Sequence, residues 1–416
     1  MDHLQRTQTH LPSLLTSILF ALCGLLLLGI GLLMGFTALM TSFSGESVQV
    51  GQTILFVAFG FEAILLFTAA FFTFQKTLSQ PSADQTSFII VSRPQILVGM
   101  FVAASVILIG SLIGGNEQVN WLLLPVLTIP AIVLPLGVLL TLGTHRLPLG
   151  TRWQSWSVLG LSMTLVPLLL LVVEAVLGIL LFIIVIAYMS FQPELVSKFQ
   201  ALAQQILILG PQSEAAQDLL SPFLTNPEVI IITLIYLAIL VPTMEELLKP
   251  LGVWLLAGRL DSIAQGFTLG ALSGAGYALI ETVGVSGQAG EWGSLLFTRI
   301  GTGLLHITTS GLMGTVIVFA WRERRYLPLI GTYLLAVLLH GLWNAVAMLY
   351  TFSTLAKLLH QTGRLGTIQL PLIVVMSFLA VLLFLILIRS NQRMRKTLTP
   401  SVPEPVLPPE TMDPSA

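Results

Sequence analysis

Charged side chains are scarce in this chain. Only 9% of the 416 residues are Asp, Glu, Lys or Arg, whereas a soluble domain carries about a quarter. The chain is 55% hydrophobic, and its mean hydropathy is +0.93. This composition excludes an ordinary soluble domain and predicts a polytopic membrane protein, with the lipid bilayer as the solvent for most of the chain.

Cysteine is almost missing as well. The single cysteine, Cys23, lies in an apolar run, which excludes an intrachain disulfide and a cluster of thiolate metal ligands. The net charge is −1, so nothing indicates nucleic-acid binding. The first apolar stretch follows Arg6 but is too long for a signal peptide, so we interpret it as a retained span.

The long apolar runs predict about ten membrane-spanning helices, each needing about 20 residues. They cover roughly residues 12–40, 51–74, 96–114, 121–143, 157–189, 229–257, 262–285, 296–320, 327–350 and 368–388. Lipid-exposed strands are not expected, so the predicted fold class is an all-α transmembrane helix bundle. The fifth span is long enough to tilt strongly or to extend beyond the lipid.

The loop charges predict that both termini are cytoplasmic. With that orientation the inner segments hold thirteen Lys and Arg residues and the outer segments hold three, in agreement with the positive-inside rule. An odd number of spans would spoil this distribution. We therefore expect an integral membrane protein, most simply of a bacterial plasma membrane.

The spans and loops divide the chain into six regions. We expect a cytoplasmic segment (1–11), an N-terminal membrane region of five spans (12–189), an extracytoplasmic loop (190–228), a core of four spans (229–350), a last loop and span (351–388) and a disordered tail (389–416). The tail is rich in proline and acidic. In the outer loop Leu195, Phe199, Leu202 and Ile206 recur at helical spacing, which predicts an amphipathic helix that lies on the membrane surface or caps the bundle.

Ionisable residues inside the membrane cost at least about 2.5–3.5 kcal/mol each, so each needs a reason. In the first half Glu62 and Glu174 stand alone, and we interpret both as structural. Spans six to nine are different, since they hold eight polar side chains: Glu245, Glu246, Lys249, Glu281, Arg299, His306, His340 and Asn344.

The stretch "VPTMEELLKP" places two glutamates and a lysine between Pro242 and Pro250. Glu245 and Lys249 are four apart and can pair, whereas Glu246 points about 100° away. Pro250 cannot donate to the carbonyl of Glu246, so a bend is expected there. The sequence also fits a capping box with Thr243 as N-cap and Glu246 at N3, after a helix restart at Pro242. Such a cap explains one glutamate only.

The following spans add a glycine seam and two histidines. Gly266, Gly270 and Gly274 recur every four residues, a pattern that lets another helix approach closely. Arg299 and His306 lie on one face of span eight, which Ser310 and Gly314 continue. His340 and Asn344 share a face of span nine. We expect the carboxylates of Glu245 or Glu246 and of Glu281 to converge with both imidazoles.

These side chains can activate water in two ways. A carboxylate can take the proton of water while a histidine orients it and an amide such as Asn344 stabilises an oxyanion. Alternatively, a zinc ion can be held by His306, His340 and a glutamate, with Glu246 and Glu281 as candidates, while another glutamate acts as base. The cations Lys249 and Arg299 would oppose a divalent ion, which favours the metal-independent alternative.

Four short stretches resemble the PrsW family in order and spacing. They are "EELLK", "GAGYALIE", "RIGTGLLH" with "SGLMG", and "HGLWN", and together they cover about residues 228–350. The family belongs to a larger group of intramembrane proteases that includes the CAAX prenyl endopeptidases and the bacteriocin-immunity proteins. The position of Glu281 follows the PrsW pattern rather than the CAAX pattern.

The resemblance implies an intramembrane endopeptidase that cuts a membrane-anchored protein, such as an anti-sigma factor. It implies Glu245, Glu246, Glu281, His306 and His340 as active-site residues. Two other classes remain open. A transporter or proton relay predicts paired broken helices in two related halves, whereas a non-catalytic scaffold, which the same superfamily contains, predicts site residues that tolerate substitution.

Overall fold

A computed structural model of the chain describes residues 10–88, 91–116, 118–210, 226–287, 292–358 and 367–398, and the single positions 215 and 219. Within this part ten helices are long and apolar enough to cross a membrane. They match the ten spans expected from sequence, and the fold is an all-α polytopic bundle. Span length depends on local composition alone, which explains the agreement.

The first five spans form the N-terminal half of the bundle. Their helices are α1 (Leu11–Phe43), α2 (Val50–Thr77), α3 (Arg93–Gly114), α4 (Asn120–Thr144), α5 (Arg152–Met163) and α6 (Leu165–Ser190). The fifth span consists of α5 and α6, which are separated at Thr164. Pro167 cannot donate to the carbonyl of Met163, so the long helix expected from sequence is interrupted there.

The second half begins with a short helix outside the spans, α7 (Pro193–Leu209). The sixth span has several pieces: α9 (Pro227–Ile235), the π-helical segment η2 (Tyr236–Leu240), α10 (Val241–Leu248), α11 (Leu251–Leu256) and the 3₁₀ turn η3 (Ala257–Arg259). The last four spans are α12 (Ile263–Ser286), α13 (Trp292–Glu323), α14 (Leu327–Leu358) and α15 (Gln369–Leu398).

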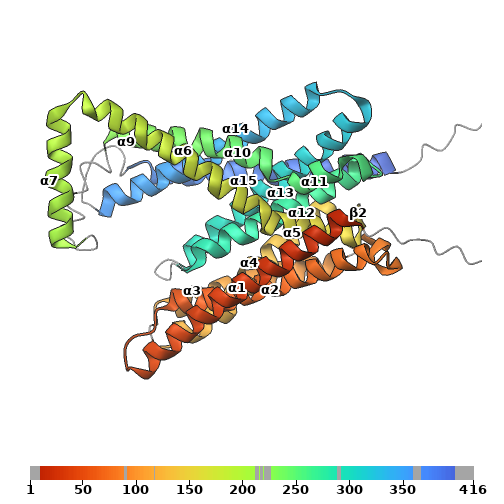
Figure 1. Cartoon of the computed structure of the whole chain (residues 1–416), viewed down its shortest axis with the longest axis horizontal. Helices are drawn as coiled ribbons and strands as arrows, with labels where there is room; N and C mark the ends of the chain where they lie inside the picture. The colour runs from red at the N-terminus through yellow and green to blue at the C-terminus, as the bar shows by residue number, and fades with distance from the viewer. Residues whose placement is uncertain are drawn as a thin grey trace, which may run out of the picture.

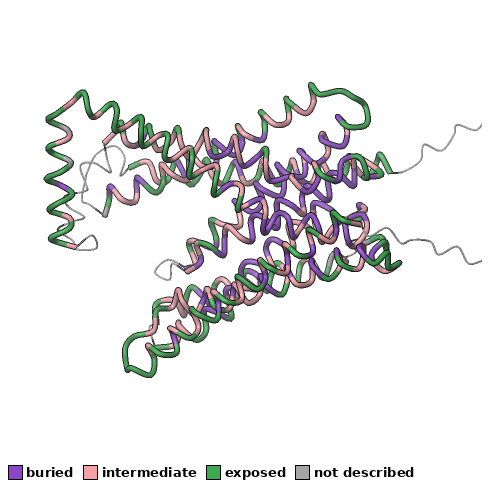
Figure 2. Tube along the Cα trace, in the orientation of Figure 1, coloured by how far each residue is buried: buried purple, intermediate pink, exposed green. Residues whose placement is uncertain are grey.

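Helices α12 and α13 form the centre of the bundle. Their most apolar stretches are 78% buried, whereas that of the span formed by α5 and α6 is 6% buried. In Figure 1, α1 to α4 lie on one side of this pair, and α6, α9, α10 and α14 lie on the other. Figure 2 shows that the buried residues concentrate around the pair. The middle of the bundle is therefore built from helices of the second half.

A glycine seam allows the two central helices to touch through their backbones. An added Cβ at Gly266, Gly270 or Gly274 would overlap the carbonyl oxygen of Gly314, Ser310 or His306 respectively. The seam expected from sequence is thus present, and its partner is α13. Because Gly274 contacts the backbone of His306, the seam directly sets the position of this histidine.

One end of the bundle gathers the ends of several spans. Nε2 of His10 lies 3.3 Å from Arg259 NH1, and Arg322 donates to the carbonyl of Leu260 at 2.9 Å. At the same end a small antiparallel ladder joins β1 (Thr86–Phe88) to β2 (Pro148–Thr151). These strands connect spans and do not cross the bundle, so the all-α class holds.

Helix α15 continues beyond the expected end of its span. The disordered tail was predicted to begin at residue 389, but the helix runs to Leu398. Asn391 explains the difference, since its amide donates to the carbonyls of Gly143 and His145 at 2.9 and 3.1 Å. Residues 399–416 of the predicted tail lie outside the described residues.

The helix expected in the outer loop is α7, which turns away from the direction of α6 (Figure 1). Leu202 is buried, whereas Leu207 and Ile208 are more than four-fifths exposed. The side chains of Leu195 and Phe199 lie outside the described part of the structure. That α7 rests on a membrane surface remains a prediction.

Candidate active site

The two adjacent glutamates follow a π-helical turn. Pro242 has no N–H to donate to the carbonyl of Ala238, and the chain forms the wider turn η2, in which the amide of Val241 bonds the carbonyl of Tyr236. Such turns are frequent at functional sites. Thr243 donates to the carbonyl of Ile239 at 2.6 Å, so the alternative of a capping box at this position is wrong.

Helix α14 holds the π turn through the motif "HGLWN". Asn344 donates its amide to the carbonyl of Leu237 at 2.9 Å. Gly341 allows close approach, since a Cβ there would overlap the carbonyl of Ala238. Asn344 was expected to face a substrate carbonyl, whereas the structure places its amide on the backbone just before the glutamates.

Helix α10 ends at Leu248, two residues after the glutamates. Lys249 is its C-cap, and Pro250 separates α10 from α11, as expected from the missing amide of proline. The carbonyl of Lys249 accepts a hydrogen bond from Ser273 on α12 at 2.5 Å. The backbone of Lys249 is therefore fixed to the central helix pair.

The Lys249 ammonium lies among four side chains from three helices. Its Nζ is 2.5 Å from Glu246 Oε1 and 3.4 Å from Glu245 Oε2. It is 2.8 Å from His306 Nδ1 and 3.3 Å from His340 Nδ1. Lys249 contacts both carboxylates unequally, and the closer one is Glu246, not the Glu245 expected from the four-residue spacing. All five residues are buried.

Glu246 also contacts His340. Its Oε1 lies 2.8 Å from His340 Nδ1, while His340 Nε2 is 3.7 Å from Glu245 Oε2. His340 therefore lies between the two carboxylates, and its ring packs edge-on against that of His306. The second oxygen of Glu246 is buried without a hydrogen-bond partner.

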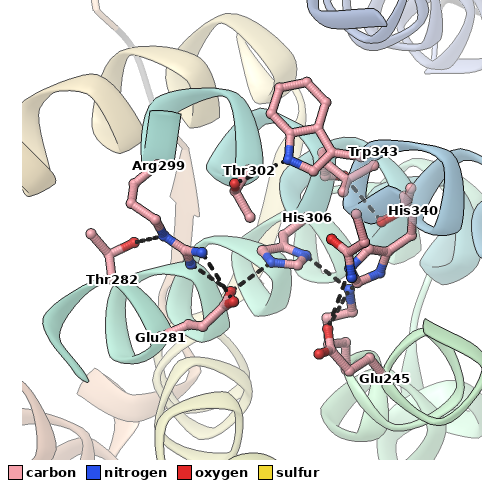
Figure 3. A network of polar contacts seen from close by, with 12 residues as sticks. Glu245, Glu281, Thr282, Arg299, Thr302, His306, His340 and Trp343 are labelled. Carbon is pink, nitrogen blue, oxygen red and sulfur yellow. Dashed lines mark hydrogen bonds and ion pairs between the residues drawn. The ribbon is translucent and has the colours of Figure 1, made fainter. Parts of the chain in front are cut away.

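Glu281 and Arg299 lie on the far side of His306 (Figure 3). His306 Nε2 is 2.8 Å from Glu281 Oε2, and Arg299 binds both oxygens of Glu281, with NH1–Oε1 at 3.0 Å and NH2–Oε2 at 2.6 Å. Arg299 also donates to Thr282. The charge of Arg299 is thus paired. Glu281 orients the imidazole of His306 from the side opposite Lys249.

Lys249 and Glu281 lie at different levels along the bundle, and His306 connects them. Glu281 lies eight residues after Ser273, or about 12 Å along the helix, and Ser273 is level with the Lys249 carbonyl. The imidazole of His306 bridges the gap by contacting Lys249 with one nitrogen and Glu281 with the other. The Glu281 side chain is 34% exposed, so this end of the network is the more open one.

Among the described residues one group of three could hold a metal ion. Ligand atoms of Glu245, His306 and His340 all lie within 4.8 Å of one another, and all three residues are buried. Two imidazoles and a carboxylate are a donor set that zinc accepts, with a fourth position for water or substrate. The two carboxylates that the sequence offered as metal ligands are not part of this group. Glu246 contacts Lys249 and His340, and Glu281 contacts Nε2 of His306.

Sequence reasoning did not single out three neighbours of the network. Ser273 binds the Lys249 carbonyl, and Tyr277 packs edge-on against His306 with ring centroids 5.2 Å apart. Trp343 donates to Thr302 at 3.2 Å. Ser273 and Tyr277 belong to "GALSGAGYALIE", so their place on the glycine-bearing helix was the available signal.

Within the described part of the chain, the side chains of the two isolated glutamates of the first half form no hydrogen bond or ion pair with this network. Glu62 is buried in α2, and its Oε1 has no hydrogen-bond partner. The main-chain carbonyl of Glu174 in α6 accepts from Tyr236 at 2.9 Å. That both residues have a structural role remains a prediction.

The comparisons with known proteins identify the family of the chain. Residues 166–385 match the family model described as PrsW family intramembrane metalloprotease. The match includes all the residues of the network and extends beyond the expected core of 229–350 on both sides. Neither the curated proteins nor the solved structures gave a match. Because the matched segment covers more than half of its length, the chain belongs to the PrsW family of intramembrane metalloproteases.

Proposed function

We propose that the chain is an endopeptidase that hydrolyses a peptide bond of a membrane-anchored protein, with water activated by the Glu245–Glu246–His306–His340 cluster. The observation that carries the proposal is the burial of two carboxylates and two imidazoles around one point, inside the segment that matches the protease family. Burying such groups is costly even when they pair, and a chemical role accounts for that cost.

Glu245, His306 and His340 would hold the metal ion of the family. Their donor atoms fit zinc in type and in spacing. When bound, the ion would polarise the scissile carbonyl and make water more acidic. Glu281 would act as a positioning residue, since a carboxylate on the second nitrogen of a ligating histidine fixes the tautomer and the ring orientation.

Glu246 would take the proton from water. Its Oε1 accepts from Lys249 and lies 2.8 Å from His340 Nδ1, while its Oε2 is buried without a partner. The first set of contacts holds the carboxylate in place, and the second oxygen remains available to a proton. A positioned general base contributes about 10²–10⁴-fold to a rate.

The metal-independent mechanism is the second candidate. It was favoured from sequence because Lys249 and Arg299 would repel a divalent ion. Arg299 is paired with Glu281 at 2.6 Å, which leaves only Lys249 as an argument against the metal, and the family description supports the metal. Activity that survives exhaustive chelation would favour this second mechanism.

The substrate class and the location extend the resemblance made from sequence. An anti-sigma-factor-like protein in a bacterial plasma membrane, and a relation to the CAAX and bacteriocin-immunity proteins, rest on that resemblance alone. The charge bias of the loops supports a cytoplasmic position of both termini. These statements stay proposals about this chain.

The transporter and scaffold alternatives make different predictions. A transporter with inverted repeats would carry broken helices and polar groups in both halves. Within the described residues the connected polar network belongs to α10, α12, α13 and α14, which supports a single site. A scaffold would tolerate substitution of Glu246, whereas a protease would not.

The test compares Glu246→Gln with Glu62→Gln. Both replace a buried carboxyl of a span by an amide, but Glu62 lies outside the network. Quantitative proteomics of membranes from cells with each variant should show uncleaved substrates accumulating with Glu246→Gln only. The substrate found in this way would then be cleaved in proteoliposomes with and without a chelator. Equal substrate profiles for the two variants would contradict the proposed protease function.

A further inference from the structure

The Lys249 ammonium contacts all three residues that could hold a metal ion. Its Nζ lies 3.4 Å from Glu245 Oε2, 2.8 Å from His306 Nδ1 and 3.3 Å from His340 Nδ1. These are the three residues whose ligand atoms lie within 4.8 Å of one another. The side chain of Lys249 is 0% exposed, so the ammonium is enclosed by the groups that would ligate the ion.

Two cations cannot occupy this space together. Zinc binds nitrogen and oxygen ligands at about 2.0–2.2 Å, so an ion on these residues would lie against the ammonium. In a buried site the repulsion between a divalent ion and an adjacent ammonium is weakly screened. Glu245, His306 and His340 can therefore bind either the Lys249 ammonium or a metal ion, but not both at once.

Any displacement of the Lys249 ammonium must come from its side chain. The main chain is fixed because Ser273 donates to the Lys249 carbonyl at 2.5 Å. The ammonium has partners outside the triad: Glu246 Oε1 at 2.5 Å, and the face of the Tyr277 ring, whose centroid is 5.5 Å away. These two groups can retain the cation when it leaves the middle of the triad.

We propose that Lys249 is an internal competitor of the metal ion: its ammonium fills the Glu245–His306–His340 site in one state, and metal binding requires the side chain to swing toward Glu246 and Tyr277. The competition keeps the buried carboxylates paired when the site holds no ion. This inference rests on the proposed function for its biological meaning, but metal binding tests it independently of proteolysis.

The experiment measures cobalt and zinc binding to the purified full chain in lipid nanodiscs by equilibrium dialysis with metal analysis. Lys249→Met removes the ammonium and keeps a long side chain, while Lys249→Gln keeps a hydrogen-bond donor in case the first variant is unstable. Lys76→Met is the control, because it removes the same charge from a partly exposed ion pair with Asp84. Thermal unfolding identifies variants that have lost their fold.

Either Lys249 variant should bind cobalt at least about tenfold more tightly than the wild type and the Lys76→Met control, since one opposing charge is removed at contact distance. Adding Glu245→Gln should abolish the gain, which would assign it to this site. The visible absorption of bound cobalt should show a tetrahedral environment containing nitrogen ligands.

Unchanged or weaker binding by both folded Lys249 variants would overturn the proposal, and so would the absence of binding by any variant. Failure of the protease function gives a different pattern. In that case metal binding responds to Lys249 as expected, but no membrane protein depends on Glu246. The converse pattern is cleavage that depends on Glu246 and survives chelation, while Lys249→Met binds no metal. That pattern would support the protease function and refute the proposal that Lys249 competes with a metal ion.

Discussion

Replacing Gly274 by alanine tests whether the seam between α12 and α13 sets the geometry of the active site. The new Cβ would overlap the carbonyl oxygen of His306 and lie 3.0 Å from the amide nitrogen of Ile307. Backbone atoms cannot rotate away, so the two helices must separate. The overlapped carbonyl belongs to His306 itself, and its imidazole must therefore shift relative to Glu245 and His340.

The size of the effect follows from the contact. The Cβ would lie 2.1 Å from the carbonyl oxygen of His306, whereas the optimal separation of non-bonded atoms is at least about 3.5 Å, so the helices must part by roughly 1.4 Å at this level. Overpacking of this kind costs about 1–3 kcal/mol of stability. A displacement of about 1 Å at reacting groups can lower a rate on the order of 10²-fold. The expected signature of Gly274→Ala is a moderate loss of stability with a large loss of activity.

Two other glycines of α12 provide matched controls. A Cβ at Gly284 would have nothing within 4 Å, so Gly284→Ala should leave activity unchanged and, as an alanine in a helix, stabilise the protein by up to about 1 kcal/mol. A Cβ at Gly266 would overlap the carbonyl of Gly314, about 12 Å along the helix from Gly274. Gly266→Ala should therefore destabilise similarly but lower activity less.

The assay combines thermal unfolding of each variant in nanodiscs with the initial rate of cleavage of a reconstituted substrate. The expected order of activity is Gly284→Ala, then Gly266→Ala, then Gly274→Ala. If Gly274→Ala is folded and as active as Gly284→Ala, the seam does not position His306 and the reasoning is refuted. Equal losses for Gly266→Ala and Gly274→Ala would assign the effect to global stability.

Three further predictions concern the network and the topology. Glu281→Gln should weaken metal binding about 10–100-fold, because loss of a carboxylate that orients a ligating histidine has effects of this size. Unchanged metal binding in equilibrium dialysis would argue against the positioning role of Glu281. Asn344→Ala should lower the free energy of unfolding by about 1 kcal/mol, since the part-buried carbonyl of Leu237 loses its donor, and an unaltered unfolding midpoint would contradict this. Reporter fusions after residue 215 should score outside and those after residue 324 inside, as the loop charges require; the same side for both would refute the topology.

Much of the fold follows from local properties of the sequence. The ten spans were predictable because burial in lipid depends on the apolar length of each segment. The break after Lys249 was predictable because Pro250 has no amide to donate. The seam of Gly266, Gly270 and Gly274 was predictable because a four-residue spacing places small residues on one face of a helix. Each of these features is decided within about one or two helical turns of the residues concerned.

The partners of the polar side chains were decided by the tertiary structure. Lys249 contacts His306 and His340, which are 57 and 91 residues away in sequence, and Asn344 bonds a carbonyl 107 residues earlier. These contacts depend on the rotation and depth of each helix relative to its neighbours, which one helix cannot specify. The sequence therefore determined which polar residues need hydrogen-bonding or charged partners inside the membrane. Only the packing of α10, α12, α13 and α14 decided that Lys249 lies among Glu245, His306 and His340. The same packing places Glu281 and Arg299 on the opposite side of His306.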